Sequence, residues 1–409
     1  MSLKKKIISA VCVLGLTVSA LTFSGCSSAN VSTALTIDGR EIPAGVYILY
    51  SGAAYGEAQT QFEEENPDID TNADDFDFKA QTVGGKSVDE FVKEKTLEAC
   101  KRYVAISKLY EEGGMTFTEK DTQDLADAVS AQWDCDLTSW VSYLPFAKGY
   151  DTLGDYYEHI GVSKASLREF YNSNQFKASI LFDSYYEKGG SREVADSEIN
   201  TYIDENYVLT RYFTISLLDD DRVLIEDAAK LEELEKLADD YAKMLNDGTA
   251  YKDVYDKYQS YLNPDKEDNA DTSDTDEEET KDSDYNRVVN KEDKIPSTEF
   301  VEALFKQSKN TAEVFKAEEN LYVVQKLDIL TESLNDTKYT DSYRSDALLG
   351  LKSDEFESIL TDTYANYTAE MNNRAPDYCK EQAANAAQGL AAVSQIQYYS
   401  YYSSLFGGY

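Results

Sequence analysis

The hydrophobic period of the chain changes twice, and these changes constrain the fold more than any other feature of the sequence. Through the first 200 residues the apolar positions recur at helical spacing, with capping signals such as the Ser87-x-x-Glu90 box. Two short runs, Tyr212–Leu218 and Leu321–Leu327, instead have the character of β-strands. Helical spacing returns after residue 330. This order predicts an α+β protein, in which N- and C-terminal segments build a mostly helical domain and a small α+β domain lies between them.

Local signals indicate where individual elements begin and end. Residues 35–42 alternate like a strand pair, with a turn at Asp38-Gly39. Residues 63–86 are acidic and polar and are expected to form a loop. The apolar positions from Leu224 to Leu245 predict one long amphipathic helix. Further helix starts are expected at Pro43, Thr118, Ser163, Asp196 and Pro296.

One stretch of the chain cannot belong to a packed core. Residues 264–285 hold eleven acidic side chains, two lysines and no aliphatic residue larger than alanine, so we expect a disordered acidic loop. The whole chain of 409 residues carries a formal net charge of −38. Such acidity argues against a nucleic-acid-binding protein, because phosphate neutralisation requires an excess of lysine and arginine.

The N-terminus has the pattern of an export signal. Three lysines at 4–6 precede an apolar run from Ile7 to Phe23, and Cys26 follows the small pair Ser24-Gly25. This arrangement resembles a bacterial lipobox, in which the cysteine thiol receives a lipid. We therefore expect a lipoprotein signal peptide over 1–25, lipid attachment at Cys26 and an extracytoplasmic chain anchored to the cell membrane. The alternatives are an ordinary secretory signal with an incidental cysteine, or an uncleaved anchor helix.

Histidine and cysteine are scarce in the mature chain. The single histidine, His159, excludes a metal site built from several histidines. Cys100, Cys135 and Cys379 remain once the signal peptide and Cys26 are set aside, so they are either three buried thiols or one disulfide and one thiol. No phosphate-binding loop is present, and no cofactor is expected.

Four oxygen-bearing side chains have the spacing that begins a calcium-binding loop: Asp68, Asp70, Asn72 and Asp74. Ala73 and Lys79 stand where such a loop needs glycine and glutamate. We expect a solvated acidic loop here and no metal site, with calcium binding as the alternative. Loose calcium binding by the run 264–285 is a second alternative to its ordinary solvation.

Several short phrases, each weak alone, occur in the order found in one family. Thr36–Pro43 resembles an opening strand, and Gly161-Val162-Ser163 resembles the start of a later helix in the same domain. Val194–Asn206 resembles the linker that follows. Ile295–Phe305 and Leu321–Lys326 resemble the last helix and strand of the next module. Together, over roughly residues 33–372, these phrases resemble the extracytoplasmic foldases of the PrsA and SurA type.

The resemblance implies a domain organisation. In that family a parvulin-type prolyl isomerase domain interrupts a helical chaperone domain, which a C-terminal helix completes. Applied to this chain, it implies a tether at 26–34, an N-terminal helical chaperone domain at 35–205, a degenerate parvulin-like domain at 206–330, C-terminal helices at 331–386 and an Ala- and Tyr-rich tail at 387–409.

Two positions depart from the family's pattern. Active parvulins carry one histidine in the first strand and another in the last, and these positions fall here at Thr214, or Phe213 if the register shifts by one, and at Tyr322. Isomerisation needs no proton transfer; it needs a pocket that favours the twisted amide over the planar one, so activity is not excluded. Because neither position is a histidine, weak or absent catalysis is expected. The candidate substrate-binding residues are Phe213, Phe300, Phe305 and Tyr322, with the core of a small domain as their alternative role.

These observations favour a membrane-anchored chaperone or foldase that holds unfolded or nascent secreted polypeptides, with little or no prolyl isomerase activity. Its membrane contact would be the lipid anchor alone, and no nucleic acid would be a partner. One alternative is an active peptidylprolyl cis-trans isomerase. A second alternative is a non-catalytic surface lipoprotein that binds a ligand or adheres to a partner.

Overall fold

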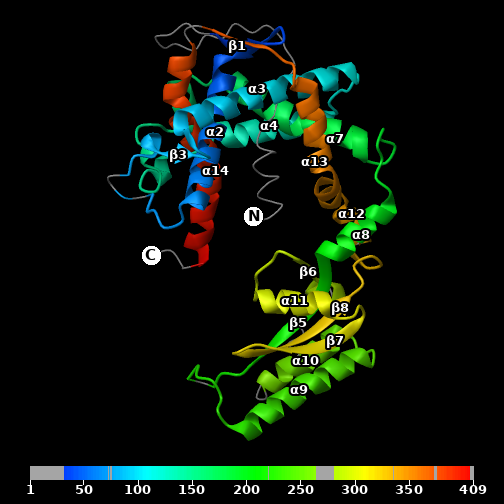
Figure 1. Ribbon diagram of the computed structural model, residues 1–409. Helices are drawn as coiled ribbons and strands as arrows, with labels where there is room; N and C mark the ends of the chain where they lie inside the picture. Colours follow the sequence, from blue (N-terminus) through cyan, green and yellow to red (C-terminus); the bar gives the residue numbers. More distant parts are fainter. Residues whose placement is uncertain are drawn as a thin grey trace, which may run out of the picture. The chain divides into compact units, whose positions relative to one another are not determined.

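The computed structural model describes residues 32–405 apart from 72, 74, 75, 220, 264–280, 335, 373 and 374, and the side chains of 174, 375–380 and 398–405 also lie outside that description (Figure 1). The predicted signal peptide, Cys26 and most of the predicted acidic loop fall outside the described residues. The described chain is α+β and mostly helical, which confirms the predicted fold class. Its compact units are a sheet unit, Val194–Leu351, and a helical unit made of the described residues on either side.

The helical unit is built from N- and C-terminal segments, as predicted. Strand β1 pairs with β2 on one side and, on the other, with β11 from near the opposite end of the chain. No helix in the described part of the chain is long and apolar enough to cross a membrane. The elements are β1 (Thr33–Ile37), β2 (Arg40–Pro43), α2 (Ala44–Glu65), η1 (Phe78–Ala80), β3 (Thr82–Val83), β4 (Lys86–Ser87), α3 (Val88–Glu112), α4 (Glu119–Trp133), η2 (Thr138–Trp140), η3 (Pro145–Ala147), α5 (Leu153–His159), α6 (Lys164–Tyr171), the π-helical η4 (Asn172–Lys177), α7 (Ala178–Tyr186), β11 (Ala369–Met371) and α14 (Ala375–Leu405).

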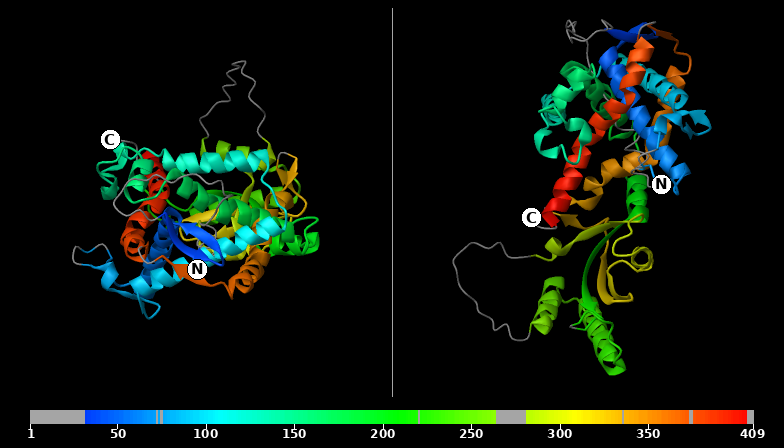
Figure 2. Two further views of the ribbon diagram at one scale, coloured as in Figure 1. Left: turned by 90° about the horizontal axis from the view of Figure 1, so that it is seen from above. Right: turned by 90° about the vertical axis from the view of Figure 1, so that its left-hand side faces the viewer.

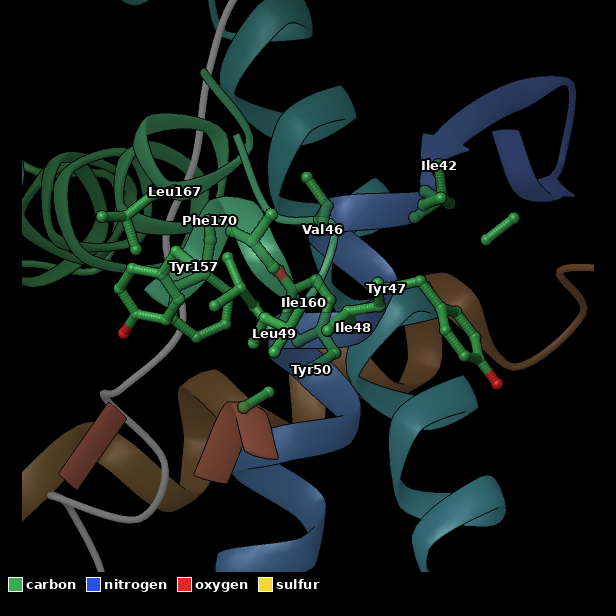
Figure 3. Close-up of a cluster of buried hydrophobic side chains, with 14 of the residues drawn as sticks. Ile42, Val46, Tyr47, Ile48, Leu49, Tyr50, Tyr157, Ile160, Leu167 and Phe170 are labelled. Carbon is green, nitrogen blue, oxygen red and sulfur yellow. The ribbon is translucent and has the colours of Figure 1, made fainter. Parts of the chain in front are cut away.

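The core of the helical unit surrounds α2, whose first turns are apolar on all sides. Val46, Leu49 and Tyr50 are fully buried, and Figure 3 shows Tyr50 beside Leu49 and Ile48 in the buried cluster. The Tyr50 ring meets the Phe170 ring of α6 edge-on, at a centroid distance of 5.3 Å. A helix that is apolar all round is stable only when other elements cover every face, and here α3, α6 and α14 do so.

Capping side chains mark several of the helix starts. Ser87 and Thr118 form capping boxes, and the Ser163 hydroxyl accepts from the Ser166 backbone N–H, as predicted. The prediction of Asp196 as a cap is wrong. Ala195 occupies the cap position without a side-chain hydrogen bond. Asp196 lies in the first turn, where its negative charge interacts favourably with the helix dipole.

The sheet unit contains a four-stranded antiparallel sheet in the order β6-β5-β8-β7. Helices α9 and α10 cover one face and α11 the other, as Figures 1 and 2 show. The elements are α8 (Asp196–Asn206), β5 (Tyr207–Ser216), α9 (Ala228–Asn246), α10 (Tyr251–Leu262), η5 (Asp282–Tyr285), β6 (Arg287–Asn290), α11 (Thr298–Lys306), β7 (Thr311–Lys316), β8 (Asn320–Leu327), β9 (Ser333–Leu334), β10 (Thr337–Lys338) and α12 (Tyr339–Ser342), while α13 (Arg344–Tyr364) begins here and ends in the helical unit.

Several predicted boundaries in the sheet unit are wrong. Strand β5 begins at Tyr207, five residues earlier than predicted, because Tyr207–Arg211 are buried on both faces and show no alternation. The predicted helix start at Leu224 is also wrong, since Asp227 caps α9 and Leu224 lies in the preceding loop. The sheet unit extends beyond the predicted 206–330 at both ends, because α8 packs against β5 and α12.

The end of the predicted acidic loop is ordered rather than disordered. Residues 282–285 form η5, and the Asp282 carboxylate accepts hydrogen bonds from the backbone N–H groups of Tyr251 (3.0 Å) and Lys252 (2.9 Å) at the start of α10. The same carboxylate lies 3.1 Å from a guanidinium nitrogen of buried Arg211. Negative charge is favourable at a helix N-terminus, so Asp282 ties the returning chain to α10.

Two predicted irregular segments contain regular structure in the helical unit. Within the predicted loop 63–86, α2 continues to Glu65 and β3 pairs with β4. The predicted tail 387–409 is helical to Leu405 as part of α14. Ala392 is fully buried, and Ile396 packs against the core. An Ala-rich face allows this close approach, so that part of the predicted tail is core.

Candidate functional site

The two positions at which the resemblance implies histidines lie directly opposite each other. Thr214 on β5 and Tyr322 on β8 are register partners at the centre of the sheet. Partners in an antiparallel pair point to the same face, so both side chains lie on the face that α11 covers. Both residues are half-buried. Strand register therefore brings these two residues together.

Aromatic rings gather around this pair. We call Tyr212, Phe300, Phe315 and Tyr322 the α11-face cluster. The Phe300 ring is buried and lies 4.9 Å from Tyr322, 5.3 Å from Tyr212 and 5.5 Å from Phe315, measured between centroids. Phe305 packs against the same apolar cluster and is half-buried. Three of the predicted binding residues, Phe300, Phe305 and Tyr322, thus share one face of the sheet.

The fourth predicted residue, Phe213, lies on the opposite face. Its ring stacks on Tyr258 of α10 at a centroid distance of 4.7 Å and meets Tyr241 of α9 at 5.7 Å. Successive strand residues point to opposite faces, so the one-residue difference between Phe213 and Thr214 decides which face each occupies. Phe213 is core beneath α9 and α10, and its assignment to the same pocket as Tyr322 is wrong.

Two buried polar side chains position α11 on the sheet. The Lys326 ammonium donates hydrogen bonds to the carbonyls of Leu304 (3.0 Å) and Phe305 (3.2 Å) at the C-terminal end of α11. The Gln307 amide donates to Thr311 O (2.9 Å) and Val324 O (3.2 Å). A cation at a helix C-terminus is favourable, although burial lowers the pKa of Lys326. Sequence reasoning missed both residues, because no local pattern marks an anchor between a strand and a distant helix.

The charge state of the α11-face cluster is simple. Burial, and to a lesser degree the neighbouring Tyr212, raises the pKa of Tyr322, so its phenol stays protonated at neutral pH and can donate a hydrogen bond. Arg287 lies over the Tyr212 ring at 4.7 Å and donates to its hydroxyl at 3.2 Å. His159 lies in the other unit, at the end of α5 with its ring 5.5 Å from that of Tyr150. This face can stack, hydrogen-bond and exclude water.

The hollow beside this cluster is small. It measures about 60 Å³ and lies between α11, β7 and β8. Small-molecule pockets are typically roughly 300–1,000 Å³. Buried Phe300 packs between α11 and the sheet together with the other residues of this apolar cluster. The hollow is lined by Phe300, Ala303, Leu304, Gln307, Glu313, Val314, Phe315 and Val324.

A larger hollow, of about 290 Å³, runs along α8. Its α8 residues Ser197, Glu198, Thr201 and Glu205 are exposed, and Leu351 of α13 is 37% exposed. Side chains so open to water give no preformed recognition of a small molecule. Tyr202 completes the lining.

The predicted metal and cysteine sites are only partly described. Asn72 and Asp74 of the calcium-like loop lie outside the described residues, as does the side chain of Cys379. Cys100 is buried and Cys135 half-buried. Among the described residues, no group of three or more His, Cys, Asp or Glu side chains could hold a metal ion.

A buried polar cluster in the helical unit was not predicted. The Tyr103 hydroxyl of α3 donates to the Glu169 carboxylate of α6. Fully buried Lys177 ends the π-helical segment, and its ammonium has no hydrogen-bond partner among the described residues. It lies 5.4 Å from the centre of the Tyr110 ring. Such a cluster reduces stability, because burying charge without full pairing is unfavourable.

The Glu169 carboxyl makes the stability of the helical unit depend on pH. Burial raises its pKa from 4.5 to about 7. The folded state then binds this proton more tightly than the unfolded state, so the contribution of Glu169 to the free energy of unfolding falls as pH rises from about 5 to 7. Glu169→Gln should remove that dependence. The free energy of unfolding of the wild type minus that of the variant should therefore fall as the pH rises from about 5 to about 7.

Urea unfolding followed by tryptophan fluorescence tests this expectation, because both tryptophans, Trp133 and Trp140, belong to the helical unit. The Tyr103 hydroxyl, Lys177 and Arg40 oppose the upward pKa shift of Glu169, and all three remain in both proteins. A difference that stays constant, or grows, between pH 5 and pH 8 would contradict the assignment.

Comparison with known proteins gives distant similarities. No protein-family model matches the chain, and no curated protein matches it. The crystal structure of foldase protein PrsA from Streptococcus pneumoniae is similar at 16% identity and a TM-score of 0.27, covering 74% of this chain and 98% of that one. The 3.10 Å crystal structure of foldase protein PrsA from Lactococcus lactis is similar at 12% identity and a TM-score of 0.31, covering 86% and 98%. Similarity at these values assigns neither an activity nor a site to this chain.

Proposed function

We propose that this protein is an extracytoplasmic, membrane-anchored chaperone or foldase that holds unfolded secreted polypeptides and has little or no prolyl isomerase activity. The observation that carries the proposal is the cross-strand pair of Thr214 and Tyr322. It stands where the family resemblance implies two histidines, on the face of a four-stranded sheet covered by one short helix. The export-signal pattern and Cys26 support the location.

The geometry of this face supports the proposal of weak or absent isomerisation. A catalyst must favour the twisted amide over the planar one, which requires a pocket that seats the proline ring and orients polar groups around the bond. Phe300 is 1% exposed and occupies the space under α11, leaving a hollow of about 60 Å³. Thr214 and Tyr322 supply two hydroxyls, but a seated proline would require Phe300 to move.

Holding an unfolded chain needs less. A partner with exposed apolar side chains gains free energy on any accessible apolar surface, roughly 25 cal/mol for each Å² removed from water. Tyrosine suits this role, since its ring offers broad apolar contact and its hydroxyl stays hydrated. The chain contains 32 tyrosines against 16 phenylalanines. No nucleotide or metal is required for such binding.

We expect no appreciable acceleration of proline isomerisation. Uncatalysed isomerisation takes tens of seconds at 25 °C, and the purified chain should shorten that time by less than about twofold in a proline-peptide assay. A buffer blank and an active parvulin provide the two reference rates. Acceleration that depends linearly on chain concentration and disappears in Tyr322→Phe would instead establish the active-isomerase alternative.

The holding activity is tested with a reduced, alkylated client protein that cannot refold. The purified chain should co-elute with this unfolded client in size-exclusion chromatography. It should not co-elute with the same protein in its folded, oxidised form. One defined folded partner in a pull-down, with no retention of the unfolded client, would support the ligand-binding lipoprotein instead.

A further inference from the structure

One end of the helical hairpin α9–α10 exposes a set of large apolar side chains. Val223 is 59% exposed and Leu224 42%, both in the loop before α9. Tyr261 is 39% exposed and Leu262 50%, both in the last turn of α10. We call these four residues the hairpin-end patch. Single exposed apolar residues are ordinary, whereas a group of them marks an interaction surface.

The two halves of the patch lie toward the same end of the hairpin, one in the loop that precedes α9 and the other in the last turn of α10. Ile225 N donates to Leu217 O at 2.9 Å, which returns the loop to the end of β5 beside the core under α9 and α10. Tyr261 lies close enough to Lys230, in the first turn of α9, to contribute to the raised pKa of that ammonium, after its main partner Glu233. The start of α9 and the end of α10 therefore lie toward the same end of the hairpin, and the loop after β5 leads into α9 (Figure 1).

Acidic residues flank the loop half of the patch along the chain. Residues 219–233 contain seven acidic and two basic side chains. One of those bases, Lys230, is already paired with Glu233 at 3.0 Å. Exposed Asp227 caps α9, and Glu226 precedes it. A partner must therefore match apolar side chains at the centre and bring positive charge to the rim.

We infer that the hairpin-end patch binds extended segments of unfolded polypeptide in which aliphatic or aromatic residues are flanked by lysine or arginine. This inference rests on the proposed function and assigns it a client-contact surface in the sheet unit, apart from the α11-face cluster. A second copy of the chain is disfavoured as the occupant, because two chains of formal net charge −38 repel each other and the rims would place like charges together.

The test uses two fluorescent peptides with the same central Leu/Val/Phe segment, one flanked by lysines and one by glutamates. In fluorescence anisotropy at low salt, the full chain should bind the lysine-flanked peptide at least about tenfold more tightly. The triple variant Val223→Ser, Leu224→Ser, Leu262→Ser should weaken that binding at least about fivefold. Tyr261 is left in place because it lies beside Lys230.

The matched control is Ile295→Ser, which removes a side chain 82% exposed elsewhere in the same unit and should leave the affinity unchanged. A second variant, Glu226→Lys, should lower the preference for the lysine-flanked peptide without removing apolar contacts. All variants alter exposed residues, and circular dichroism melting checks that each folds like the wild type.

The outcomes separate the inference from the proposed function. If the wild type retains the unfolded client and the triple variant binds the lysine-flanked peptide as tightly as the wild type, the patch is not the client surface, although the holding function stands. Equal weakening by Ile295→Ser would also overturn the inference, as would concentration-dependent dimerisation that the triple variant abolishes. If the wild type retains no unfolded client, the proposed function itself fails.

Discussion

Alanine in place of Phe300 should lower the free energy of unfolding of the sheet unit by about 3–5 kcal/mol, the usual loss for a buried aromatic ring. The ring is 1% exposed and contacts Tyr212, Phe315 and Tyr322. Its removal would leave a cavity between α11 and the sheet. The helix would not close over this cavity, because Lys326 and Gln307 hold its C-terminal end on the sheet. For a unit of this size the melting temperature should fall by on the order of 10 °C.

Far-UV circular dichroism measures this melting, and tryptophan fluorescence separates the two units, since both tryptophans are in the helical unit. The dichroism transition should move while the fluorescence transition stays in place. Phe305→Ala is the control, because its half-buried ring should contribute far less. If Phe300→Ala destabilised the sheet unit no more than Phe305→Ala did, the α11-face cluster would not be the packed structure described above.

Two glycines on α2 should respond to alanine with opposite signs. Alanine is the better helix former by roughly 1 kcal/mol, so Gly56→Ala should stabilise the helical unit by about 0.5–1 kcal/mol, because nothing lies within 4 Å of an added Cβ. At Gly52 an added Cβ would lie 2.6 Å from Ala386 Cβ and 2.8 Å from Ala387 N. Gly52→Ala should therefore destabilise the unit by about 1–3 kcal/mol, the usual result of overpacking.

Urea unfolding followed by tryptophan fluorescence measures both variants in the unit that changes. Because the substitution and the helix are the same, intrinsic propensity cancels, and the contact with α14 accounts for the difference. Equal stabilisation by the two alanines would mean that α14 does not pack against α2 at Gly52.

How much could be predicted depended on whether a signal is local. The capping boxes at Ser87 and Thr118 use side chains within three residues of the helix start, so the sequence alone indicates them. The start of β5 could not be found in this way, because Tyr207–Arg211 are buried on both faces and lack a period of two. The burial of Ala392 in the predicted tail could not be predicted either, since it depends on residues distant in the sequence.

In the candidate site, too, local signals were predictable and contacts between distant residues were not. The family resemblance, placed on the two predicted strands, indicated Thr214 and Tyr322, and their pairing across β5 and β8 follows from register. Phe213 was grouped with them because apolar residues in a short strand do not reveal which face they occupy, and a shift of one residue reverses it. Lys326 is invisible to local analysis, since its partners, the carbonyls of Leu304 and Phe305, are about twenty residues away.

A holding function requires that the chain protect an unfolded protein from aggregation. The direct measurement is light scattering after a chemically denatured client is diluted into buffer with increasing amounts of the purified chain. The account predicts progressive suppression of aggregation, nearly complete at a few chains per client, without nucleotide or metal and with no change in the rate of proline isomerisation. Unchanged scattering at large stoichiometric excess, with the chain folded by circular dichroism, would contradict it.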